Sequence, residues 1–121
     1  FQGAIKRYPL WLDSVHRAKK YSEQNNQLLQ VLTLDKGRYD IVLSDISIYK
    51  YFVLQAERKS GKKLNEVQFH RFVEVNPDDY RPVFWNETIR NDFNEGITYL
   101  KQTGRYQQIY DKYLKAKDSD E

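Results

Sequence analysis

The sequence predicts an α/β fold in which a small parallel or mixed sheet is flanked by helices. Residues Asp40–Leu43 form a short apolar run with two β-branched side chains, which is typical of a buried parallel strand. Gly37 stands before this run and ends the preceding helix, and Asp45 follows it at the start of the next helix. Because helical and extended segments alternate along the chain, we expect helices layered against a sheet.

Length and composition suit a single domain, or one lobe of something larger. The chain has 121 residues, of which 40% are hydrophobic and 31% are charged, as in a soluble globular protein. Its 20 basic and 17 acidic residues are interleaved, so there is no basic stripe of the kind that binds nucleic acid. The absence of cysteine excludes disulfides, thiolate chemistry and Cys-based zinc sites. We therefore expect no nucleic-acid partner, no metal and no cofactor.

The first third of the chain predicts two helices. Pro9 suits the first turn of a helix that runs to about Tyr21. The polar residues Ser22–Asn26 predict a loop, and a second short helix follows around Leu28–Leu32. This helix is the one that Gly37 ends.

The middle of the chain predicts a strand, a helix and a second strand. After Asp40–Leu43, Asp45 caps a helix, and apolar residues recur on its inner side: Ile46, Tyr49, Phe52, Val53 and Ala56. A turn is expected at Ser60–Lys63, and Gln68–Val75 alternates as a strand would. Asn76–Asp79 is a clear break.

The last third predicts a strand and two helices. Tyr80–Trp85 is the expected strand, and Pro82 places it at a sheet edge or at a site where the missing N–H does no harm. Asn86 caps a long helix whose apolar residues recur at helical spacing: Ile89, Phe93, Ile97 and Leu100. Gly104 ends that helix, and a last helix carries its own apolar face: Tyr106, Ile109, Tyr110, Tyr113 and Leu114.

Three segments, Phe1–Ala4, Leu28–Asp45 and Tyr80–Leu114, resemble in order and spacing the family 3 periplasmic solute-binding proteins, the amino-acid receptors of ABC importers. The resemblance implies that residues 1–79 are the second lobe of that fold. Residues 80–121 would be the hinge strand and the C-terminal helices that return to the first lobe. Since the first part of lobe 1 has no counterpart here, the fold would be incomplete relative to the two-lobed family.

The resemblance also implies a ligand site. Asp45 matches the acidic residue that accepts hydrogen bonds from the ligand's ammonium group, although Asp is also a common helix N-cap. Gly3 and Ala4 match a turn whose backbone N–H groups bind the ligand carboxylate, although a plain tight turn is an equal alternative. Many relatives carry Ser or Thr where this chain has Ala4 and Ile5, which weakens the match to amino-acid ligands.

The function implied is that of an extracytoplasmic, periplasmic solute-binding module. Its partners would be a small polar solute such as an amino acid, and an ABC permease. One alternative is the periplasmic sensor domain of a membrane signalling protein. Another is an enzyme on the same fold, but no catalytic motif is present, and His16 and His70 lack companion metal ligands. We expect no enzyme activity, and we expect self-association through the apolar faces that would otherwise pack on lobe 1.

Overall fold

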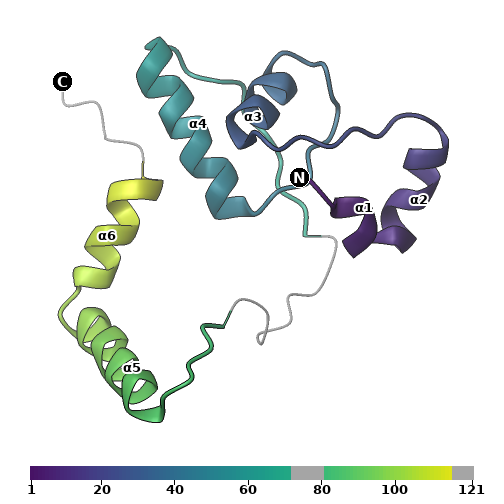
Figure 1. The fold of residues 1–121 in the computed structure, drawn as a ribbon. Coiled ribbons are helices and arrows are strands. Elements are labelled where there is room, and N and C mark those ends of the chain that lie inside the picture. Colours follow the sequence, from purple (N-terminus) through teal and green to yellow (C-terminus); the bar gives the residue numbers. More distant parts are fainter. Residues whose placement is uncertain (72–80, 116–121) are drawn as a thin grey trace. The chain divides into compact units, whose positions relative to one another are not determined.

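The structure, a computed structural model, describes residues 1–71 and 81–115. Within these ranges the chain forms helices and no strand (Figure 1). The helices are α1 (Ala4–Arg7), α2 (Pro9–Arg17), α3 (Gln27–Asp35), α4 (Ile46–Ser60), α5 (Glu87–Gln102) and α6 (Arg105–Leu114). None of the helices among the described residues has the length and hydrophobicity needed to cross a membrane.

The prediction of an α/β fold is wrong. Asp40–Leu43 lies outside any helix, but within the described ranges no other segment forms a strand ladder with it. An extended segment becomes a strand only when a neighbour exchanges backbone hydrogen bonds with it, and β-branched composition alone does not supply that neighbour. Ile41 is accordingly 85% exposed instead of buried in a sheet.

The other two expected strands do not form a sheet either. Residues 68–71 and 81–84 are irregular, without a ladder. Residues 72–75 and Tyr80, which complete those two predictions, lie outside the described residues, as does the predicted break at 76–79. The structure divides into two compact units, Phe1–Val67 and Gln68–Glu121. The functional division at 79/80 stays a prediction, and the two units are described separately below.

In the first unit, α3 packs against α4, and their contact buries most of the core. Val31 from α3 is 1% exposed, and Tyr49, Leu54 and Ala56 from α4 are also buried. Asn26 caps α3, since its Oδ1 accepts a hydrogen bond from the Leu29 N–H at 3.0 Å. Local capping and an apolar face thus place both helices where the sequence predicts them.

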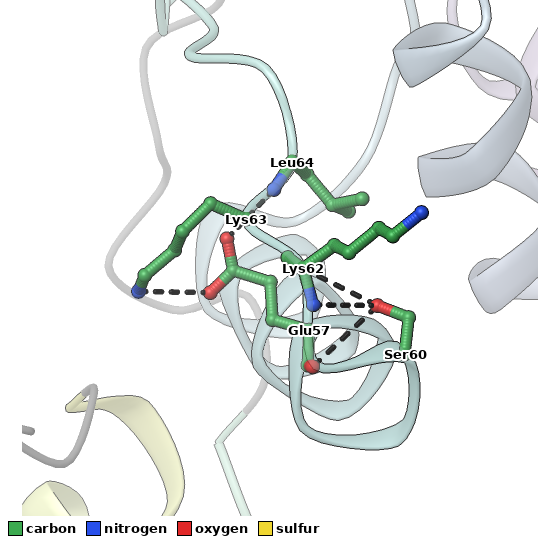
Figure 2. Close-up of polar contacts among 5 residues, drawn as sticks. All are labelled: Glu57, Ser60, Lys62, Lys63 and Leu64. Carbon is green, nitrogen blue, oxygen red and sulfur yellow. Dashed lines mark hydrogen bonds and ion pairs between the residues drawn. The ribbon is translucent and has the colours of Figure 1, made fainter.

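The end of α4 is fixed by a compact set of polar contacts (Figure 2). Gly61 adopts a left-handed φ of 67° and donates its N–H to the Glu57 carbonyl at 2.8 Å. The Glu57 carboxylate accepts the Leu64 N–H at 3.0 Å and the Lys63 ammonium at 3.2 Å. The Ser60 Oγ accepts the Lys62 N–H at 3.2 Å. These contacts account for the turn at Ser60–Lys63.

The chain after this turn is tied back to α3. The Asn65 N–H donates to Asp35 Oδ1 at 2.9 Å, and the Asn65 side-chain amide donates to the Asp35 carbonyl at 3.0 Å. The segment that follows α4 is therefore held on both sides. Side chains of α4 bind its first residues, and the side chain of Asp35 in α3 binds Asn65.

The helix α2 is shorter than expected. Pro9 is in its first turn, as predicted, but the helix ends at Arg17, and Lys19 takes a positive φ of 55°. None of the residues in α2 is buried, and among the described helices α2 packs against α1.

The second unit contains α5 and α6, which contact each other across the short turn that joins them. Asn86 caps α5, with its Oδ1 accepting the Thr88 N–H at 2.8 Å and the Ile89 N–H at 3.2 Å. The rings of Phe84 and Phe93 lie 5.1 Å apart, so the segment before α5 packs on that helix. Gly104, at φ 73°, supplies the left-handed turn between the helices. The Asn86 cap and the Gly104 turn occur at the residues where the sequence predicts them, whereas the contact of Phe84 with Phe93 was not predicted.

Candidate functional site

Asp45, the first predicted site residue, is the N-cap of α4. Its backbone is extended, at φ −64° and ψ 136°, and its Oδ1 accepts the Ile48 N–H at 2.9 Å. The side chain is exposed. A carboxylate has two oxygens with about four acceptor positions, so capping α4 leaves Asp45 able to accept further hydrogen bonds. A ligand contact of Asp45 stays a prediction.

Gly3, the second predicted site residue, lies in a turn that holds a carboxylate of the chain itself. Its φ is 79°, and its N–H donates to Glu23 Oε2 at 2.8 Å. The Tyr21 hydroxyl donates to the other oxygen of Glu23, also at 2.8 Å. The Ile5 N–H in turn donates to the Tyr21 hydroxyl at 3.0 Å. Both oxygens of the Glu23 carboxylate are therefore held by named donors.

Ala4, the third predicted site residue, plays a different part. It is 1% exposed, so its methyl group belongs to the core. Its N–H donates to the Phe1 carbonyl at 3.3 Å and closes the turn. The carboxylate contact at this turn is thus made by the N–H of Gly3 and not by that of Ala4.

The ionisation of this cluster follows its hydrogen bonds. The pKa of Glu23 is lowered, first by the Gly3 N–H and then by the Tyr21 hydroxyl, because both donate to the charged carboxylate. The pKa of Tyr21 is raised, first by burial and then by its hydrogen bond to Glu23. A charged Glu23 and a neutral Tyr21 are therefore the pair of states that the cluster favours.

A hydrogen bond from the N-terminal ammonium group to a backbone carbonyl brings the two predicted parts of the site to the same region. The nitrogen of Phe1 donates to the Leu43 carbonyl at 3.2 Å. Phe1 is two residues from Gly3, and Leu43 is two residues from Asp45. The structure thus places the Gly3 turn and the start of α4 beside the same contact, although they are far apart in sequence.

Tyr21 and Glu23 were missed by sequence reasoning, which assigned Tyr21 to a helix end and Glu23 to a polar loop. Hydrophobic periodicity carries no information about a single carboxylate in a loop. The spacing of a Tyr and a Glu two residues apart, directly after a helix, was the only available signal, and it is weak.

The described residues give no support for a metal centre. Across residues 1–71 and 81–115, no group of three or more His, Cys, Asp or Glu residues is placed to hold a metal ion. The ring of His16 lies 5.7 Å from that of Tyr21 in an edge-on arrangement, so it packs beside the cluster described above.

Comparison with known proteins returned no match to this chain among protein-family models, curated proteins or solved structures. The resemblance of the three segments to solute-binding proteins therefore stays a prediction.

Proposed function

We propose that this chain is a solute-binding module of the extracytoplasmic, amino-acid type, and that Gly3 and Asp45 contribute to one face of its site. The observation that carries the proposal is the contact of the Gly3 N–H with a carboxylate, at 2.8 Å. A turn that binds the carboxylate of Glu23 has the donor chemistry needed for the carboxylate of an amino acid.

The exposed carboxylate of Asp45 supplies the complementary chemistry. An α-amino acid carries one anionic and one cationic group a few bonds apart, and the Phe1–Leu43 contact lies two residues from each proposed partner. In this proposal the solute carboxylate replaces that of Glu23 at the Gly3 N–H, and its ammonium group donates to Asp45. Ala4 supports the turn through its buried methyl group and its own hydrogen bond.

The proposed location is the periplasm. The proposed partner that recognises the solute-bound protein is an ABC permease. The sensor domain of a membrane signalling protein could bind its solute in the same way. Transport and signalling therefore differ in the membrane partner and not in the solute site. The proposal depends on the order of the three resembling segments and on the chemistry of the site, and it does not require the sheet that the sequence predicted.

A titration followed by amide NMR tests the proposal. We expect millimolar affinity for free amino acids, because one face alone removes little water from a ligand. The amides of Gly3 and Ile48 should shift together and saturate, and neither acetate nor methylammonium alone should reproduce this.

Asp45→Asn is the decisive variant, with Asp40→Asn as the matched control, since both residues are exposed. Asn can still cap α4, so the fold should persist while the amino-acid shifts disappear. Equal titrations of the two variants, or shifts scattered over the chain without saturation, would rule out this site.

A further inference from the structure

The first two helices are joined to the rest of their unit with little apolar burial. Among the helices of residues 1–71, α1 packs on α2, and neither packs on α3 or α4. α2 contains no buried residue, and the buried side chain of α1 is that of Ala4, a single methyl group. The Phe1 nitrogen adds one hydrogen bond, to the Leu43 carbonyl at 3.2 Å. A segment attached in this way opens at low cost in free energy.

Glu23 lies at the centre of the polar contacts that hold this segment. Its Oε2 accepts the Gly3 N–H and its Oε1 accepts the Tyr21 hydroxyl, both at 2.8 Å. That hydroxyl accepts the Ile5 N–H at 3.0 Å, so the carboxylate reaches a second backbone group of the segment through Tyr21. The ionised carboxylate makes charge-assisted bonds to both donors, whereas protonation removes the charge and turns one oxygen into a donor.

The chain on either side of Glu23 is held to the α3–α4 core. The side chains of Ser22 and Gln24 donate hydrogen bonds to the Tyr39 hydroxyl. In α3, the Gln30 side-chain amide donates to the Gln24 carbonyl at 3.5 Å. Glu23 therefore connects a segment that belongs to the core with a segment that does not.

The charges of the two segments make this connection sensitive to acid. Residues 1–20 carry five basic and one acidic side chain, a net charge of +4. Residues 21–67 carry seven basic and six acidic side chains, a net charge of +1, and Glu23 is the carboxylate among them that binds the Gly3 N–H. When carboxylates become protonated, residues 21–67 become more positive, and the two segments repel each other.

The groups that face Glu23 favour its ionised form. The Gly3 N–H, the Tyr21 hydroxyl and the positive charge of the Phe1 ammonium group lower the pKa of Glu23 below its ordinary value of 4.5. His16 of α2 packs on the ring of Tyr21. Because the folded chain lowers the pKa of Glu23, the contribution of this carboxylate is complete above about pH 4.5 and is lost as the pH falls through the folded pKa. A histidine ordinarily titrates near pH 6.5, which separates the two kinds of transition.

We propose that Glu23 is an acid-sensitive switch: protonation of its carboxylate releases residues 1–17 from the α3–α4 core, which itself stays folded. The released helices unfold, because α1 and α2 have 4 and 9 residues and helices of this length are marginal on their own. The switch is thus an order-to-disorder transition of one segment. It holds whether or not the Gly3 turn binds a solute.

A pH titration of the full chain followed by NMR tests the proposal. Between about pH 6 and about pH 3, the range in which carboxylates titrate, the Cα shifts of residues 9–17 should lose roughly half or more of their helical displacement. The shifts of α3 and α4 should keep theirs through the same transition. The transition should move to lower pH at high salt, because salt screens the repulsion between the two segments.

Glu23→Gln and Glu66→Gln form a matched pair, since both remove one exposed carboxylate from residues 1–67. Glu23→Gln should show reduced helical shifts in residues 9–17 already at about pH 6, without a further acid transition, because its side chain carries no charge at any pH. Glu66→Gln should titrate like the parent chain.

Three results would each overturn the proposal. The first is an acid transition of residues 9–17 in Glu23→Gln that equals that of the parent chain. The second is a loss of helical shifts in α3 and α4 together with those of α2, which would mean that the whole unit unfolds. The third is a parent chain in which residues 9–17 keep their helical shifts throughout the titration.

Discussion

The α3–α4 pair and the α5–α6 pair use the same local devices to different effect. Both begin with capped helices, at Asn26 and Asp45 in the first region and at Asn86 in the second. α3 and α4 bury six residues between them, while α5 and α6 bury none. Caps and periodicity therefore define where a helix lies, but the neighbouring surface decides whether its apolar face is closed.

The largest expected loss of stability comes from a substitution in the core of the first region. Leu54→Ala removes a buried side chain from α4 and should lower the free energy of unfolding by about 2–4 kcal/mol, since it leaves a cavity. Ile89→Ala in α5 should cost less than about 1 kcal/mol at concentrations where the chain is monomeric, because Ile89 is 58% exposed. Urea unfolding followed by circular dichroism measures both values. Equal losses would mean that α5 and α6 have a closed core of their own.

Removing the caps should affect the two regions alike. Asp45→Ala and Asn86→Ala each delete a side-chain acceptor of backbone N–H groups, at 2.9 Å in α4 and at 2.8 Å and 3.2 Å in α5. We expect each to cost about 1 kcal/mol of helix stability, measured by thermal unfolding. Asp45→Asn serves as the control for α4, because the amide oxygen can still cap. A loss from Asp45→Asn as large as that from Asp45→Ala would show that the charge of Asp45 and not its hydrogen bond stabilises α4.

The pH dependence of the first region should include a contribution from Glu23. The folded chain lowers the pKa of Glu23 below its ordinary value of 4.5, because Gly3 and Tyr21 donate to the carboxylate. The resulting stability is fully present above about pH 4.5 and is lost as the pH falls through the folded pKa. Glu23→Gln should flatten the stability curve in this acidic range and leave the curve near pH 7 with the same slope. An unchanged acid limb would mean that the Gly3 contact does not persist in solution.

The smallest effect should come from the exposed ion pair of α5. Arg90 lies 2.7 Å from Glu87, and both side chains are at least half exposed to solvent. Arg90→Ala should change the melting temperature little, in line with about 0.3–0.5 kcal/mol for such a pair. Repeating the melt at high salt should remove even this difference. A large, salt-independent loss would point instead to packing by the arginine stem.

The helices could be read from the sequence because their signals are local. Pro9, Asn86 and Gly104 act through backbone conformation and a hydrogen bond to a near neighbour, so their effect does not depend on the rest of the fold. The sheet could not be read in the same way. Asp40–Leu43 has the composition of a strand, but a ladder needs a second segment at the right distance, which no local pattern specifies.

The candidate site was predictable in part for the same reason. The cap at Asp45 is local, and it lies where the sequence places it. The contact of Gly3 with Glu23 joins residues 20 positions apart, and that of Phe1 with Leu43 joins residues 42 apart. Such pairs are set by tertiary packing, so the occupant of the Gly3 turn could not be derived from the sequence.

Amide hydrogen exchange at single-residue resolution tests the contrast between the two regions most directly. It should be measured at low protein concentration, where association between copies does not add protection. We expect the amides of α3 and α4 to exchange far more slowly than those of α5 and α6, because only the first pair has a buried core. Protection of α5 and α6 equal to that of α3 and α4 under these conditions would contradict the account.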